Sequence, residues 1–185
     1  MARVHTQTKT RRGKEVKCGR CGAAIEPGEK YHSWSFRYGG AHYRCELRPP
    51  KPSELTQSKM STVLAAIEDL DGVLSNLDNT GDFDEAKGEV RAYVETVQES
   101  IEEVKGEYEE AAEHFGGGGP NQELAEQMEA CYDEVEDILS TIDQLEVEEA
   151  DSEEEDTEED QDARREQAFQ ELTDAAERVH EVSFP

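Results

Sequence analysis

The chain has 185 residues, of which 34% are hydrophobic and 35% are charged, and its formal net charge at pH 7 is -27. No stretch approaches the roughly 18 apolar residues that a membrane span needs, and the N-terminus lacks the apolar core of a secretory signal. The low apolar content also excludes a large globular enzyme core. We therefore expect a cytoplasmic protein without membrane contact.

The charge is distributed unevenly along the chain. Residues 1–52 contain twelve Lys and Arg residues against four acidic residues, a net charge of +8, so the remainder carries -35. A basic module attracts polyanions whereas an acidic one repels them, and this asymmetry predicts two functional parts. The expected organisation is a basic zinc-finger module (1–48), a proline-rich linker (49–52), a three-helix arm (53–147), an acidic disordered spacer (148–160) and a C-terminal amphipathic helix (161–185).

The basic segment contains three of the four cysteines, as Cys18-x-x-Cys21 followed after 20 residues by His42-x-x-Cys45. Two short chelating pairs suit one tetrahedral zinc ion, and four protein ligands predict a closed, structural site. Without an export signal, a disulfide is the weaker interpretation. His32 is the alternative fourth ligand, and Cys131 falls at an apolar helix position, where we expect a small core residue.

Aromatic residues fill the segment between the two ligand pairs. Residues 29–38 and 41–45 flank Gly39-Gly40, a pattern typical of a β-hairpin. Alternation along the first strand places the aromatic positions on one face. These rings form either the core of a small finger or, with Arg37 and Arg44, a surface that stacks on nucleic acid. The aromatic-face positions are His32, Trp34, Phe36 and Tyr38.

Cations in and before the finger suggest a nucleic-acid interface for DNA or RNA. Phosphate contacts need clustered or flexible cations, and a basic run precedes the first cysteine pair. The predicted contact residues are Arg11, Arg12, Lys14, Arg20, Arg37 and Arg44.

Over residues 18–45 the ligand spacing resembles that of the poly(ADP-ribose) polymerase-type finger and of the first half of a LIM module. This resemblance implies a treble-clef-like, zinc-stabilised binding module, and in the polymerase-type case one that recognises DNA. A broader stretch, residues 1–5, 30–40 and 49–58 with the acidic helical region after them, is similar to uncharacterised small proteins of tailed phages and prophages. That resemblance implies a location in the host-cell cytoplasm or in the virion, and it implies no known activity.

Beyond residues 49–52 there is no proline until Pro120, so long helices are permitted. Apolar residues recur at steps of three and four, and breaks at residues 78–82 and 116–120 allow the helices to turn back. This pattern predicts a long antiparallel helical bundle or coiled coil, and hence a mainly α protein with a small zinc-stabilised β-hairpin finger. The repeat positions are Met60, Val63, Ile67, Leu70, Leu74 and Leu77; Val90, Val94, Val97, Ile101, Val104, Tyr108, Ala111 and Phe115; and Leu124, Met128, Cys131, Val135, Ile138, Ile142 and Leu145.

The C-terminal segment carries Phe169, Leu172, Ala176 and Val179 at helical spacing. This helix is either a fourth member of the bundle or a peptide that docks on another molecule.

No nucleophile motif or phosphate-binding glycine loop is present, so we do not expect an enzyme. Two functions remain. In the first, the finger binds nucleic acid, while the acidic arm binds a protein partner, self-associates or shields the finger. In the second, the chain is a phage assembly or interaction protein in which zinc is purely structural.

Overall fold

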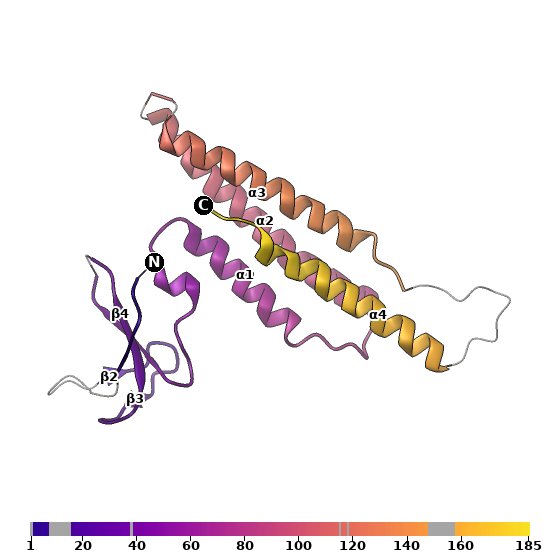
Figure 1. The fold of residues 1–185 in the computed structure, drawn as a ribbon, viewed down its shortest axis with the longest axis horizontal. Helices are drawn as coiled ribbons and strands as arrows, with labels where there is room; N and C mark the ends of the chain where they lie inside the picture. Colours follow the sequence, from indigo (N-terminus) through magenta and orange to yellow (C-terminus); the bar gives the residue numbers. More distant parts are fainter. Residues whose placement is uncertain (1, 8–15, 38, 115, 118, 148–157) are drawn as a thin grey trace. The chain divides into compact units, whose positions relative to one another are not determined.

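The computed structural model describes residues 2–7, 16–37, 39–114, 116–117, 119–147 and 158–185. The chain forms two compact units, Met1–Leu64 and Ala65–Pro185, and the division falls within helix α1 (Met60–Leu74). The first unit contains the described strands and the second is helical (Figure 1). The predicted fold class, mainly α with a small N-terminal β region, is confirmed.

The N-terminal unit contains two small antiparallel sheets. Three strands, β1 (His5–Gln7), β4 (Tyr31–Ser35) and β5 (Ala41–Cys45), pair in the order β1-β4-β5. Two shorter strands, β2 (Val16–Lys17) and β3 (Ala24–Ile25), pair with each other. The predicted hairpin is therefore present as β4 and β5, and β1 adds an edge strand that the sequence analysis did not predict.

The register of β4 and β5 decides which side chains share a face of the three-stranded sheet. Tyr31 lies opposite Cys45, and Trp34 lies opposite His42. Because side chains alternate along a strand, the sheet has two distinct faces. The cysteine face carries Tyr31, Ser33, Tyr43 and Cys45, and the tryptophan face carries His32, Trp34, His42 and Arg44.

A short 3-10 helix, η1 (Pro52–Leu55), packs against Trp34 on the tryptophan face. The Trp34 indole Nε1 donates to the backbone oxygen of Glu54 at 3.0 Å, and Trp34 is 3% exposed. The Ala2 backbone amide also donates to the Leu55 backbone oxygen. Residues 52–55 are thus integrated into the N-terminal unit, which differs from the predicted linker at 49–52 that separates two parts.

The helical unit is built around an antiparallel hairpin of α2 (Phe83–His114) and α3 (Pro120–Asp143). In three polar contacts, the residue number rises along α2 while that of the partner falls along α3 and the residues just after it, as antiparallel packing requires. The contacts join Lys87 to the Leu145 backbone oxygen, Arg91 to Asp143 and Lys105 to Glu129.

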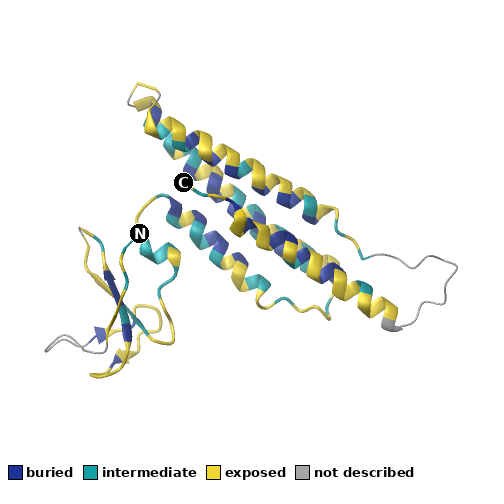
Figure 2. Cartoon of the chain, viewed as in Figure 1, coloured by how far each residue is buried: buried dark blue, intermediate teal, exposed yellow. Residues whose placement is uncertain are grey.

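Helix α4 (Glu158–Glu177) and η2 (Arg178–Glu181) pack on this hairpin. The rings of Phe83 and Phe169 meet edge to face with centroids 5.4 Å apart, and the predicted apolar positions of the C-terminal segment are buried. Figure 2 shows buried positions along the helices alternating with exposed ones. Of the two interpretations of the C-terminal helix, the structure agrees with the one in which it is a fourth member of the bundle. No helix in the described ranges is both long and apolar enough to cross a membrane.

Candidate metal centre

The first two cysteines lie on a tight turn that follows β2. The Cys18 amide donates to the Ala23 carbonyl at 2.9 Å, and the Gly22 amide donates to the Cys18 carbonyl at 2.8 Å. Gly22 has a φ of 72°, in the left-handed region that glycine adopts without strain. This turn projects Cys18 and Cys21 toward the same point, so the x-x spacing of the sequence acts as a chelating pair.

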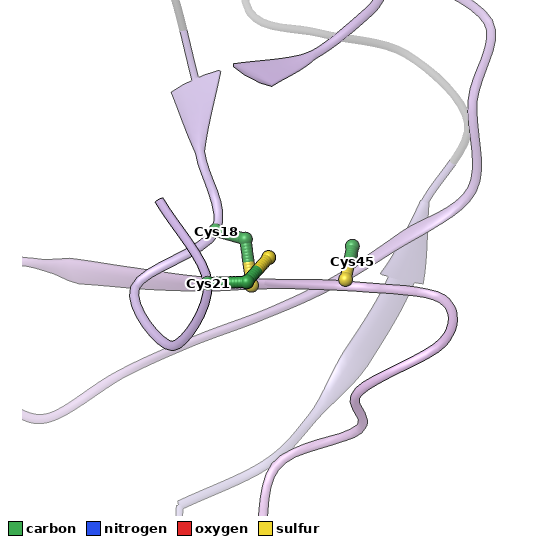
Figure 3. Close-up of side chains that lie close together, drawn as sticks. All are labelled: Cys18, Cys21 and Cys45. Atoms are coloured by element: carbon green, nitrogen blue, oxygen red, sulfur yellow. The ribbon is translucent and has the colours of Figure 1, made fainter. Parts of the chain in front are cut away.

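Strand β5 brings the third cysteine to this turn. The Gly19 amide donates to the Tyr43 carbonyl at 2.9 Å, and a Cβ atom at Gly19 would overlap the Arg44 guanidinium. Glycine at this position therefore leaves room for the Arg44 guanidinium beside the turn. The sulfur atoms of Cys18, Cys21 and Cys45 all lie within 4.8 Å of one another (Figure 3), close enough to hold a metal ion.

The cysteine cluster belongs to the hydrophobic core of the N-terminal unit. Cys18 is 1% exposed and packs with Val16, Ile25 and Tyr31, whereas Cys21 is exposed. Tyr43 and Cys45 pack against the same group. This core is small, so a bound metal would contribute a large share of the stability of the unit.

The surroundings of the sulfur atoms favour negative charge at one of them. Burial raises the pKa of the Cys18 thiol, but hydrogen bonds from the backbone amides of Cys21, Cys45 and Arg20 outweigh burial and lower the pKa to about 6. The pKa of Cys45 is raised by burial and by hydrogen bonds and charge from the other two cysteines. A cation among the sulfur atoms would relieve this mutual repulsion.

His42 does not lie with the sulfur atoms, contrary to the prediction that it is the fourth ligand. It belongs to the tryptophan face, where its ring stacks on Trp34 with centroids 5.2 Å apart and an interplanar angle of 16°. The physical reason is the strand itself. Residues 42 and 45 are three apart in β5, so their side chains point to opposite faces of the sheet. Two residues with the same spacing can bind one metal ion only where the backbone turns, as it does at Cys18 and Cys21.

The alternative fourth ligand, His32, does not join the cluster, and neither does Cys131. His32 also lies on the tryptophan face, where its Nδ1 is 3.3 Å from Thr6 Oγ1. Cys131 is buried in α3 of the helical unit, as expected of a core residue, and burial followed by the charge of Glu134 raises its pKa. Within the described residues, three cysteines form the potential ligand set.

Two of the residues predicted to contact nucleic acid form ion pairs with an acidic side chain. Arg20 Nη2 lies 3.1 Å from Glu54 Oε1, and Arg44 Nη2 pairs with the same oxygen atom. The Arg44 guanidinium also lies 5.3 Å from the Trp34 ring centroid. Arg37 is exposed. Arg11, Arg12 and Lys14 lie outside the described residues.

Glu54 connects η1 to the sheet, and its importance could not be read from the sequence. Burial raises the pKa of its carboxyl, but hydrogen bonds and charge from Arg44, the Lys51 amide and Arg20 together hold that pKa below its ordinary value. The ionised carboxylate therefore stabilises the fold above its ordinary pKa of about 4.3, and the stabilisation is lost as the pH falls through the lower folded value.

We expect Glu54→Gln to destabilise the N-terminal unit by about 1–3 kcal/mol at pH 7, because two arginines lose a charged partner. Glu46→Gln, which removes the exposed partner of Lys30 at 3.3 Å, is the matched control and should cost less than about 1 kcal/mol. Urea denaturation followed by Trp34 fluorescence measures both. The cost of Glu54→Gln should shrink toward pH 3, and a cost that stays constant with pH would contradict the ionised pair.

The fold and the cysteine cluster define a small, metal-competent β unit joined to an acidic helical bundle. Comparison with protein-family models, with curated proteins and with solved structures gave no match.

Proposed function

We propose that the N-terminal unit is a zinc-stabilised module that binds nucleic acid, and that the acidic helical unit modulates this binding. The observation that carries the proposal is the convergence of Cys18, Cys21 and Cys45 in a unit of strongly basic composition. Three thiolates favour a soft or borderline metal, and zinc is the common choice among closely spaced cysteines. The burial of Cys18 in the core of the unit supports a structural role for the zinc.

The charge of each unit supports a polyanionic ligand. Residues 1–64 contain thirteen Lys and Arg residues against five acidic residues, a net charge of +8. Arg20 and Arg44 pair with Glu54, and Lys30 pairs with Glu46. The phosphate contacts are therefore assigned to the basic run at residues 9–14 and to Arg3, which is exposed and forms no ion pair with a described residue. Residues 65–185 carry -35 and are tethered to it, so they compete with nucleic acid as an intramolecular polyanion.

The test compares the full chain with a variant in which every Asp and Glu of residues 148–160 is replaced by Asn or Gln. We expect the variant to bind labelled DNA or RNA more tightly at low salt, because a local competitor is neutralised. Affinity should fall by about 0.9 log units per neutralised phosphate for each log unit of salt for duplex DNA. Fluorescence anisotropy at several salt concentrations measures both effects.

Arg11→Ala combined with Arg12→Ala should weaken this binding without changing the metal content. Failure of both the full chain and the neutralised variant to bind any nucleic acid at low salt would contradict the proposal.

The second candidate function is that of a phage assembly or interaction protein whose metal serves only to stabilise the N-terminal unit. The engagement of Arg20 and Arg44 by Glu54 favours this alternative, since it removes two of the expected phosphate contacts. Capture of a virion protein by the chain, without nucleic-acid binding, would support it.

A further inference from the structure

The cysteine face of the three-stranded sheet contains a cavity of about 470 Å³. Its volume falls within the range of roughly 300–1,000 Å³ that is usual for ligand sites. It extends from Tyr31, which lines it, toward the end of β4 that pairs with the start of β5. The residues of interest in its lining are Arg3, His5, Gln7, Ser33, Ser35 and Tyr43.

Polar groups in this cavity are fixed by a chain of hydrogen bonds. The Tyr31 hydroxyl donates to Gln7 Oε1 at 3.0 Å, and Gln7 Nε2 donates to Ser33 Oγ at 3.2 Å. Ser33 Oγ in turn donates to the His5 backbone oxygen at 3.5 Å. These bonds set the orientation of the Gln7 amide, whose second N–H can donate to a ligand without reorganisation.

Among the described residues that line the cavity, Arg3 carries a positive charge at neutral pH. Arg3 and His5 are exposed and form no ion pair with any residue that the structure describes, and no described acidic residue lines the cavity. On the tryptophan face, in contrast, Arg44 is paired with Glu54 and covered by η1. The two faces of the sheet therefore differ, because the arginine of the cysteine face, Arg3, has no acidic partner among the described residues and lies in the same cavity as the half-buried Tyr43.

Tyr43 supplies an aromatic ring to the cavity. It is half-buried, and its centroid lies 6.0 Å from that of Tyr31, which packs in the core and holds Tyr43 in place. A positioned ring beside cations is the usual arrangement for binding an unstacked base and its backbone. Bases of a duplex are already stacked on their neighbours, so an aromatic cavity of this kind selects single strands.

We infer that this cavity binds single-stranded nucleic acid, with one base against Tyr43 and Gln7 and the adjoining phosphates on Arg3 and His5. The inference rests on the proposed function and moves the principal contact from the predicted Arg20 and Arg44 to the opposite face of the sheet.

The test is fluorescence anisotropy of the full chain with labelled 12-nucleotide dT and rU strands and a 12-base-pair duplex at low salt. Arg3→Ala and Gln7→Ala should each weaken single-strand binding at least about threefold, and Tyr43→Leu at least about fivefold, as loss of a stacked base does. Arg48→Ala removes an exposed arginine that does not line the cavity and should change affinity less than twofold. Retained metal content shows that Tyr43→Leu is folded.

The possible failures are distinguishable. If the wild-type chain binds but Arg3→Ala and Gln7→Ala behave like Arg48→Ala, the cavity is not the site, while the proposed function stands. Tighter binding of the duplex than of either single strand would also overturn the inference. If no probe binds, both this inference and the proposed function are contradicted. A labelled peptide of residues 148–160 that binds in an Arg3-dependent way, when the oligonucleotides do not, would assign the cavity to the chain's own acidic segment.

Discussion

Cys45→Ser is expected to release the metal and unfold the N-terminal unit while most of the helical circular dichroism persists. The unit has a small core, in which Cys18 packs with Val16, Ile25 and Tyr31. Structural zinc contributes apparent binding free energies of about 10–16 kcal/mol in small modules, comparable with the whole stability of a typical domain. The loss of one of three ligands therefore removes more stability than this core supplies.

Trp34 is the only tryptophan of the chain and lies in the N-terminal unit, so its fluorescence reports on that unit alone. Cys131→Ser is the matched control, because Cys131 is buried in the helical unit and lies outside the cysteine cluster. It should leave both the Trp34 emission and the metal content unchanged. Collapse of the helical signal in Cys45→Ser would show that the two units fold as one.

Leu172→Ala is expected to destabilise the helical unit by about 2–5 kcal/mol, through lost burial and the cavity left behind. Leu172 is 0% exposed in α4, a helix held on the α2 and α3 hairpin in part by the Phe83 and Phe169 contact. Urea denaturation followed by circular dichroism measures the change. Glu166→Ala provides a control in the same helix, because Glu166 is exposed, and it should alter stability by less than about 0.5 kcal/mol.

A cost for Leu172→Ala as small as that of Glu166→Ala would mean that α4 does not pack in the bundle in solution. The same measurement therefore checks the choice between a fourth bundle member and a peptide that docks elsewhere.

The helices were predictable because their signal is local. Val90, Val94, Val97 and Ile101 recur at steps of three and four, and all four are fully buried in α2. The position of α4 was not predictable, since its apolar stripe has the same pattern whether it packs on this chain or on another. Its packing depends on contacts between segments far apart in sequence, such as that of Phe83 with Phe169.

The candidate metal centre was predicted in part. Cys18 and Cys21 lie on one turn, and the sequence signal for that turn, paired cysteines with glycines, is local. The prediction that His42 is a ligand was wrong because the hairpin pattern and the ligand spacing imply different orientations for its side chain. Strand alternation over residues 41–45 was available in the sequence and would have set His42 and Cys45 on opposite faces.

Two further features of the N-terminal unit had weaker signals. The strand at His5–Gln7 is only three residues long and pairs with residues far along the chain. Glu54 follows a proline-rich segment, and nothing in its neighbourhood indicates that its carboxylate pairs with Arg20 and Arg44. Both depend on tertiary contacts rather than on local propensity.

The most direct test of the metal centre is native mass spectrometry of the full chain and of three single variants purified with zinc. The account predicts one zinc ion per chain in the wild type, its retention in His42→Ala and Cys131→Ser, and its loss in Cys18→Ser. Absence of zinc from the wild type, or loss of zinc in His42→Ala from a chain whose Trp34 emission is unchanged, would contradict the three-cysteine centre.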